Sequence, residues 1–181
     1  MDDINTLRRI LSQNRVIAVV GLSADWFRPS YFAAKYMQEH GYTVIPVNPR
    51  YTEVLGQKCY KSLRDIPGKV DIVDCFRKTE DIMPIAEDAI AIGAKVLWQQ
   101  LGVRNESAAA KARAAGLETV LDRCVKIEHG RLFGGLNWVG VNTRGTLQGP
   151  YRCASNNPGY ALGGRSSGRI DAFNVRCRKA P

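Results

Sequence analysis

Apolar residues in the first 130 positions fall into short runs that alternate with stretches of helical spacing. The first run, residues 16–21, is uninterrupted and stops at a glycine. A run of this kind, without alternation of polar and apolar positions, is typical of a strand buried on both faces of a parallel sheet. Comparable runs at residues 43–47, 71–76, 95–98 and 118–121 predict four further strands.

Helical patterns separate these strands. Apolar residues recur at intervals of three and four over residues 3–13, 30–40, 82–92 and 107–115, which predicts amphipathic helices. Ser30 is placed to cap the second of them. The alternation predicts an α/β fold with a Rossmann-like, doubly wound parallel sheet of five strands. Ligands of such sheets bind at the carboxyl ends of the strands, near the point where the strand order reverses.

Charge divides the chain into two parts. Residues 131–181 contain eight Lys or Arg and one Asp, so seven of the nine net positive charges lie there. The same stretch is punctuated by glycine, asparagine and serine pairs and has no sustained hydrophobic period. A segment of low hydrophobicity and one charge sign buries too little surface to fold alone. We therefore expect one domain over residues 1–132 and a disordered, basic, Gly- and Arg-rich tail over residues 133–181.

Composition also argues against several classes of protein. No apolar run approaches the ~18 residues that span a membrane, and the acidic start of the chain (Asp2, Asp3) is unlike a secretory signal. The five cysteines include no CxxC pair, and with only two histidines no zinc-ligand spacing is present. We expect a cytoplasmic protein with no membrane association and no metal.

The first strand ends in features that suit a phosphate. Gly21-Leu22-Ser23 closes the strand and Arg28-Pro29-Ser30 opens the next helix. Glycine permits a tight turn and a close ligand, and the free N–H groups of a helix N-terminus attract an anion. The Arg28 guanidinium adds donors that match phosphate oxygens. The segment therefore predicts a phosphate site, although a plain strand–helix turn has the same outline.

The ends of the other strands narrow the choice of nucleotide. The full G-x-G-x-x-G fingerprint is missing, and the second strand runs into Asn48-Pro49-Arg50 where an NAD site has an acidic residue. A base at that place favours a ribose with an extra phosphate, as in NADP or coenzyme A. Phe76-Arg77 follows the third strand and could flank an adenine and a phosphate, and Gln99 and Gly102 after the fourth could face a ligand.

Catalytic groups are scarce. The sequence has no Ser-His-Asp arrangement, no G-x-S-x-G elbow and no G-K-[ST] loop. His40 stands at a predicted helix end, and His129 follows the last predicted strand without a nucleophile to pair with. We therefore expect no catalytic residues, and a binding protein fits the sequence better than an enzyme.

Together these motifs resemble the CoA-binding domain family, which comprises small stand-alone CoA-binding proteins and, more distantly, the N-terminal domain of the succinyl-CoA synthetase α subunit. The resemblance covers about residues 5–130 and departs from the family at Arg144. It is carried by residues 19–23, 28–31, 41–49, 70–74, 93–95, 98–102 and 122–124.

The resemblance implies that the protein binds coenzyme A, or an acyl-CoA, as a carrier or regulatory protein. By match to the family pattern, the pyrophosphate would lie on Gly21, Ser23, Arg28 and Ser30, the ribose and its 3′-phosphate by Asn48, Pro49 and Arg50, and the adenine by Phe76 and Arg77. The phosphohistidine domain of the synthetases is not found in this sequence, so ligase activity is not implied.

Two other functions remain open. An NADP-dependent oxidoreductase would use the same strand ends, but the sequence lacks a Tyr-x-x-x-Lys pair and the glycine fingerprint. A nucleic-acid-binding module would use the basic tail, where Tyr151, Tyr160 and Phe173 are too sparse for a stacking platform. We rank coenzyme A first, and expect no nucleic-acid partner.

Overall fold

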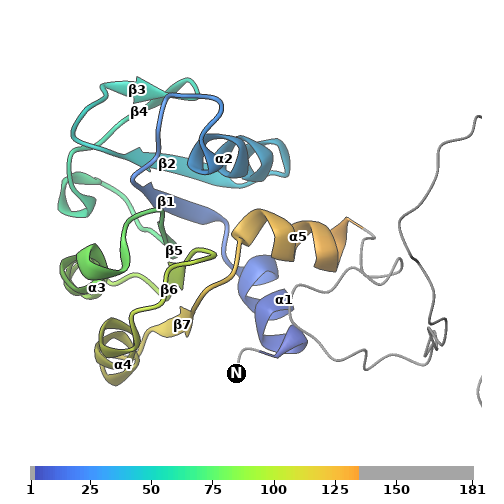
Figure 1. The fold of residues 1–181 in the computed structure, drawn as a ribbon, viewed down its shortest axis with the longest axis vertical. Coiled ribbons are helices and arrows are strands. Elements are labelled where there is room, and N and C mark those ends of the chain that lie inside the picture. Colours follow the sequence, from blue (N-terminus) through green and yellow to red (C-terminus); the bar gives the residue numbers. More distant parts are fainter. Residues whose placement is uncertain (1–2, 135–181) are drawn as a thin grey trace, which may run out of the picture.

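A computed structural model of the chain describes residues 3–134 and shows a parallel sheet with helices on both faces (Figure 1). The five strands lie in the order β2-β1-β5-β6-β7 and all neighbouring pairs are parallel. This confirms the predicted Rossmann-like α/β fold. The strands are β1 Val16–Val20, β2 Thr43–Val47, β5 Ile72–Cys75, β6 Val96–Gln99 and β7 Glu118–Val120.

The strand order reverses at β1, because β2 lies on one side of it and β5, β6 and β7 follow on the other. The switch point between β1 and β5 is therefore where a ligand is expected. Val19 pairs with Pro46 of β2 and with Asp74 of β5, which brings the ends of the three strands to one edge of the sheet. Gly21 and Phe76 come directly after β1 and β5 at this edge.

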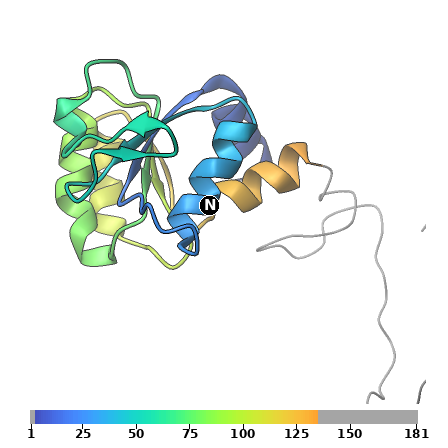
Figure 2. The same cartoon turned by 90° about the horizontal axis from the view of Figure 1, so that it is seen from above.

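Five helices cover the two faces, as the view from above shows (Figure 2). One face carries α1, α2 and α5, and the other carries α3 and α4, as the two separate hydrophobic clusters confirm. Their bounds are α1 Ile4–Gln13, α2 Pro29–Glu39, α3 Ile82–Ala91, α4 Glu106–Ala114 and α5 Val125–Phe133. Short 3-10 turns, η1 Leu63–Asp65 and η2 Thr79–Asp81, precede α3.

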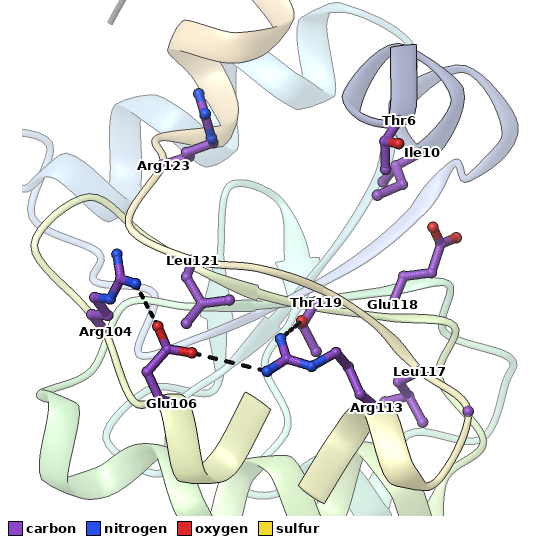
Figure 3. A pocket seen from close by; sticks show the side chains of 11 residues that line it. Thr6, Ile10, Arg104, Glu106, Arg113, Leu117, Glu118, Thr119, Leu121 and Arg123 are labelled. Carbon is purple, nitrogen blue, oxygen red and sulfur yellow. Dashed lines mark hydrogen bonds and ion pairs between the residues drawn. The ribbon is translucent and has the colours of Figure 1, made fainter. Parts of the chain in front are cut away.

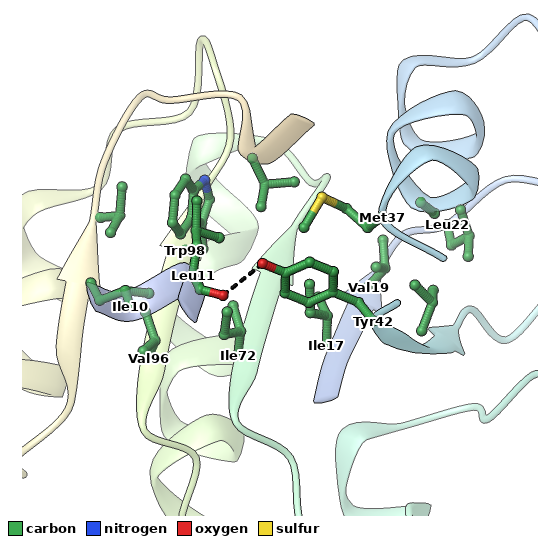
Figure 4. Packing of buried hydrophobic residues seen from close by; sticks show 14 of the residues in the cluster. Ile10, Leu11, Ile17, Val19, Leu22, Met37, Tyr42, Ile72, Val96 and Trp98 are labelled. Carbon is green, nitrogen blue, oxygen red and sulfur yellow. Dashed lines mark hydrogen bonds between the residues drawn. The ribbon is translucent and has the colours of Figure 1, made fainter. Parts of the chain in front are cut away.

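The core under α1 and α2 is built from large side chains (Figure 4). Leu11 and Met37 pack from the helices toward the sheet, and Trp98 of β6 is fully buried. The Tyr42 hydroxyl donates to the Leu11 carbonyl at 2.6 Å, and the Trp98 indole N–H donates to the Arg123 carbonyl at 2.7 Å. Both polar groups are therefore satisfied inside the apolar layer.

The opposite layer is built from small residues. Ala86 and Ala89 of α3 face Ala108 and Ala112 of α4, and all four are fully buried. Small side chains allow the two helices and the sheet to pack closely, so the space between them holds little more than the side chains of the strands. The Ala-rich composition of α4 is thus a packing requirement.

Two elements were not predicted from the sequence. A small hairpin, β3 Glu53–Val54 and β4 Gln57–Lys58, follows β2, and α5 follows β7. The polar sequence of α5 hides its burial: Glu128 and Arg131 are both about 1% exposed and are joined by an ion pair. Arg123 adds a second ion pair to Glu128 at 3.0 Å. A charged pair can be buried when its partners neutralise it, which a hydrophobicity pattern does not reveal.

The predicted domain boundary at residue 132 falls within α5, one residue before its end. The predicted disorder of the tail concerns residues that lie outside the described range, apart from residues 133–134, so it stays a prediction. Within residues 3–134, none of the helices has both the length and the apolar character needed to cross a membrane.

Candidate functional site

Gly21 makes the closest backbone approach at the switch point. Its φ is +86°, and a Cβ built there would lie 2.5 Å from the carbonyl oxygen of Phe76 and 2.8 Å from the Cδ of Arg77. Any other residue would collide with the segment after β5, so glycine is needed both for its conformation and for its size. The collision partners also show that the two strand ends predicted as ligand-binding segments are in contact.

The loop between β1 and α2 is held by its own side chains. The Ser23 N–H donates to the hydroxyl oxygen of buried Ser30 at 3.1 Å, and the Asp25 N–H donates to the Ser23 hydroxyl at 3.1 Å. Leu22 is fully buried beneath the loop. The two serines therefore shape the turn, and each hydroxyl can still donate its own proton to a ligand.

The N-terminus of α2 points into this loop. The helix begins at Pro29, so the residue in the N-cap position is Arg28 and not Ser30 as the sequence predicted. Proline at the first helical position needs no N–H acceptor, and no side chain caps the helix. The N-terminus of the helix therefore has no side-chain cap, while the Asp25 carboxylate beside it accepts from the Phe27 N–H at 3.0 Å. The Arg28 guanidinium is largely exposed and lies 3.6 Å from the Asp25 carboxylate.

Asn48 joins the loop after β2 to the loop after β1. Its side-chain amide donates to the Leu22 carbonyl at 2.9 Å, and its side-chain oxygen accepts from the Arg50 N–H at 3.0 Å. The residue is buried, so its side chain is occupied by these two bonds. Asn48 thus fixes the backbone of the two loops, and its side-chain amide points to these backbone groups and not to the edge of the sheet.

A pocket of about 310 Å³ opens beside these residues. Ligand pockets span about 300–1,000 Å³, so this volume suits one end of a nucleotide and not a whole coenzyme. Its walls come from the ends of β1 and β2 on one side and from α3 on the other. The lining residues are Val20, Gly21, Val47, Asn48, Pro49, Lys61, Ser62, Leu63, Arg77, Asp81, Pro84, Ile85 and Asp88.

The pocket joins an apolar interior to charged groups. Val47 and Leu63 are buried parts of the core, which gives the pocket apolar walls. Arg77 makes an exposed ion pair with Asp81 at 3.4 Å. Lys61 also lines the pocket, and among residues 3–134 no carboxylate lies within ion-pair distance of its ammonium group.

Lys61 and Ser62 were missed by the sequence analysis. They reach the pocket because Tyr60 forms an isolated parallel bridge with Val47, and the Asn48 N–H donates to the Tyr60 carbonyl at 2.9 Å. These contacts return the chain to β2 after the β3–β4 hairpin. A pairing between single residues has no hydrophobic period, so only the fold could reveal it.

Nine of the thirteen predicted ligand residues do not line this pocket. Five of them belong to the adjoining β1–α2 segment (Leu22, Ser23, Arg28, Pro29 and Ser30), and the other four are Arg50, Phe76, Gln99 and Gly102. Gln99 is fully buried, and its amide donates to the Asn105 carbonyl at 3.0 Å and accepts from the Asn105 N–H at 2.6 Å. It anchors the start of α4 and has no free face for a ligand. Gly102 is exposed, with its N–H on the Asp122 carboxylate at 2.8 Å, and Arg50 is exposed in the turn after Pro49. Phe76 is half-buried against the core.

Two buried titratable groups, the acidic Asp74 and the basic His129, lie away from the pocket. Burial raises the pKa of Asp74 to about 7, and the Gln100 amide donates to its carboxyl group at 2.7 Å. Burial lowers the pKa of His129, whose ring nitrogen lies 3.2 Å from the Tyr36 hydroxyl. His40 stacks on Tyr36 as well, so both histidines belong to one aromatic cluster between α2 and α5.

A larger hollow of about 1,000 Å³ runs along the outer edge of β7 (Figure 3). Its arginines are engaged: Arg104 and Arg113 both face Glu106, and Arg113 donates to the Thr119 hydroxyl at 2.7 Å. The hollow lies at the side of the sheet, far along the strand order from the switch point. The smaller pocket is the better candidate because a tight glycine turn and an uncapped helix adjoin it.

Comparisons with known proteins show the family of the chain. Residues 15–130 match the family model described as a CoA binding domain. The chain is 41% identical to the protein YneT of Bacillus subtilis over 123 residues, which is 68% of this chain and 91% of YneT. A solved structure of a protein from Pyrococcus horikoshii is 47% identical with a TM-score of 0.71, covering 73% of this chain and 93% of that one.

A shorter match links the chain to an enzyme. It is 48% identical over 59 residues to the subunit alpha of an ADP-forming acetate–CoA ligase from Pyrococcus furiosus. This match covers 32% of this chain and 13% of the ligase subunit, so it concerns a small part of that protein. The family match and the YneT match span most of the described residues. The chain belongs to the CoA-binding domain family.

Proposed function

We propose that the protein binds coenzyme A, or an acyl-CoA, across the carboxyl ends of β1, β2 and β5, in a carrier or regulatory role without catalysis of its own. The observation that carries the proposal is the collision a Cβ at Gly21 would make with Phe76 and Arg77. The turn packs tightly against the segment after β5 and forms part of the wall of the 310 Å³ pocket, and α2 follows it in the chain.

The adenine end fits the pocket against α3. Val47, Leu63 and Ile85 supply apolar surface for a flat base. The Arg77 side chain, next to Gly21, lies where the base and the first phosphate would meet. A base has hydrogen-bonding groups on its rim, and Ser62 lies on the same wall. Apolar faces with a few polar groups are the usual composition of a nucleotide pocket.

The phosphates fit the two positive features of the edge. The pyrophosphate would lie over Gly21 and Ser23 at the N-terminus of α2, where helix dipole and N–H groups favour an anion. The Arg28 guanidinium, which is 70% exposed, can turn from Asp25 toward it. The 3′-phosphate of the ribose would lie by Lys61, with Arg50 on the turn outside the pocket.

The absence of catalysis is also a proposal. It is supported by the burial of Asp74 and Cys75 and by the location of His129 in an aromatic cluster away from the pocket. None of these groups faces the space that the ligand would fill. A cytoplasmic location remains a prediction from the sequence.

NADP is the second candidate, because it also carries an ADP unit with an added ribose phosphate. The same Lys61 ammonium group and the same non-acidic end of β2 would accept it. The two coenzymes differ in which ribose hydroxyl is phosphorylated and in the group beyond the pyrophosphate. Hydride transfer would also need a second substrate beside the nicotinamide, and CoA ranks first because the chain matches the CoA-binding domain family.

Calorimetric titration with CoA, dephospho-CoA, NADP and NAD tests the proposal. We expect CoA to bind most tightly and dephospho-CoA about tenfold or more weakly, since one charge-assisted contact is worth about 1.5–3 kcal/mol. Lys61→Ala should remove that difference, and Lys69→Ala, at an exposed lysine just before β5 and at the opposite ends of the strands, serves as the matched loss of one positive charge. Tighter binding of NADP than of CoA would move the function to redox chemistry. No binding of any of the four would refute the site.

A further inference from the structure

Exposed apolar side chains gather at the edge of the sheet that holds the proposed coenzyme site. Residues 3–134 contain six large hydrophobic side chains that are exposed: Ile4, Trp26, Phe27, Phe32, Leu101 and Phe133. Four of them follow the carboxyl end of a strand, in the β1–α2 loop, the first turn of α2, or the loop after β6. Single exposed apolar residues are ordinary, but a concentration at one place marks a binding surface.

Trp26 and Phe27 form the centre of this surface. Their rings lie 4.5 Å apart, and the side chains are 66% and 75% exposed. Hydrogen bonds hold the backbone beneath them: the Phe27 N–H donates to the Asp25 carboxylate at 3.0 Å, and the Arg28 N–H donates to the Asp25 carbonyl at 3.0 Å. The fold thus presents two aromatic rings to solvent on a turn that its own polar groups define.

The course of the ligand leads toward these rings. The pocket for the adenine end is lined by α3, which lies on one face of the sheet, whereas α2 lies on the other. A ligand with its pyrophosphate at the α2 N-terminus has therefore crossed the edge of the sheet between β1 and β5. The part of the ligand beyond the pyrophosphate therefore extends from the edge of the sheet on the side of α2 and α5.

The surface on that side is apolar and bordered by a cation. Phe32 in the first turn of α2 packs under the Lys126 ammonium group of α5, which lies 4.9 Å from the ring centroid. Leu101 follows β6, two strands from β1, and strands are spaced about 4.8 Å apart, so it lies about 10 Å further along the edge. A flexible arm that leaves the pyrophosphate passes the aromatic rings before it reaches solvent.

We propose that the ligand of this site is a CoA thioester with a hydrocarbon acyl chain, and that the chain covers Trp26 and Phe27. The acyl site extends the proposed coenzyme site and exists only if that site binds CoA. Free CoA ends in a thiol and would leave both rings in water. An acyl chain of several methylene groups removes the rings from water, and that burial strengthens binding without any new polar contact.

Titration of the full chain with CoA and with octanoyl-CoA tests the proposal. We expect octanoyl-CoA to bind about tenfold or more tightly than CoA, which burial of only two methylene groups would provide. The double variant Trp26→Ala, Phe27→Ala should bind the two ligands alike and keep the affinity for CoA. Phe133→Ala is the control: this exposed ring packs on His129, which contacts Tyr42 at the opposite ends of the strands, and it should keep the preference.

A fluorescence measurement on the same samples gives a second readout. Trp98 is buried and Trp26 is exposed, so covering Trp26 should shift the emission to shorter wavelength with octanoyl-CoA and not with CoA. The third tryptophan, Trp138, lies outside the described residues, so we expect the shift to disappear in the double variant, which lacks Trp26 and keeps Trp138. Equal affinities of the wild type for the two ligands, or a preference that survives in the double variant, would overturn the acyl site while leaving the coenzyme site intact. Failure of both ligands to bind would overturn the coenzyme site itself.

Discussion

Replacement of Gly21 by alanine isolates the close approach on which the proposed site depends. Gly21 and Gly41 both have a positive φ of nearly the same value, +86° and +82°. They differ in their surroundings, because a Cβ at Gly41 would meet nothing within 4 Å, whereas a Cβ at Gly21 would lie 2.5 Å from the Phe76 carbonyl oxygen. Gly41→Ala is therefore the matched control for backbone strain.

The expected magnitudes follow from these two contributions. A left-handed conformation costs alanine about 1–2 kcal/mol relative to glycine, and both variants carry that cost. Gly21→Ala must also displace the Phe76 backbone, and forcing an extra methyl group into a packed site costs about 1–3 kcal/mol. We expect Gly41→Ala to lose about 1–2 kcal/mol of unfolding free energy, and Gly21→Ala to lose about 2–5 kcal/mol.

Urea denaturation of the two variants and the wild type measures these losses, and CoA titration of the same proteins measures the site. Gly21→Ala should weaken CoA binding by tenfold or more even where it is folded, because Phe76 and Arg77 move, while Gly41→Ala should bind as the wild type does. Equal losses of stability in the two variants would refute the close approach. Unchanged CoA binding by Gly21→Ala would refute the role given to this turn.

Three further changes test the buried polar groups. Burial raises the pKa of Asp74 from 3.8 to about 7, so the protonated carboxyl group stabilises the fold at pH 4, and this stabilisation is lost as the pH rises through 7. Between pH 4 and pH 8, the unfolding free energy of Asp74→Asn, which keeps the acceptor for Gln100, should rise by about 4 kcal/mol relative to that of the wild type in urea titrations. Burial lowers the pKa of His129, so the stability that the neutral ring contributes is present above the ordinary pKa of 6.5 and is lost as the pH falls below it. His129→Phe should therefore flatten the decline in unfolding free energy between pH 7 and pH 5, and an unchanged slope would contradict this assignment. Trp98→Phe removes the donor to the Arg123 carbonyl and some buried volume, and should lower the unfolding free energy by about 2–3 kcal/mol in thermal or urea melts; a loss below about 0.5 kcal/mol would show that the bond contributes nothing.

The sheet could be predicted from the sequence because its strands are buried on both faces. An uninterrupted apolar run such as Val16–Val20 leaves few alternatives to a parallel strand. Glycines after β1 and after α2 marked the turns correctly, and both have a positive φ. The N-cap of α2 lies two residues earlier than predicted, at Arg28 instead of Ser30, because Pro29 occupies the first helical position without a capping side chain.

The features that the sequence analysis did not predict are held in place in a different way. The α5 helix is buried through ion pairs among Arg123, Glu128 and Arg131, so its sequence looks solvent-exposed. The position of Lys61 depends on one bridge between Val47 and Tyr60, which connects segments separated by a hairpin. Periodicity reports burial by hydrophobicity within an element, and neither feature is of that kind.

Gln99 shows the limit of assigning ligands by position. It stands at the end of β6, on the edge where ligands bind, and its residue type suits hydrogen bonding. Its amide nevertheless turns inward and bonds the backbone of Asn105. The sequence predicts which strand ends meet, but the direction of a polar side chain at that edge depends on which backbone groups nearby lack partners.

A crystal structure of the protein grown with coenzyme A tests the central claim most directly. The account predicts the adenine between Val47 and Ile85, the pyrophosphate over Gly21 at the N-terminus of α2, and the ribose phosphate beside Lys61. Coenzyme A bound along the outer edge of β7, among Arg104 and Arg113, would contradict it, as would crystals grown at saturating coenzyme in which the pocket beside Gly21 holds only water.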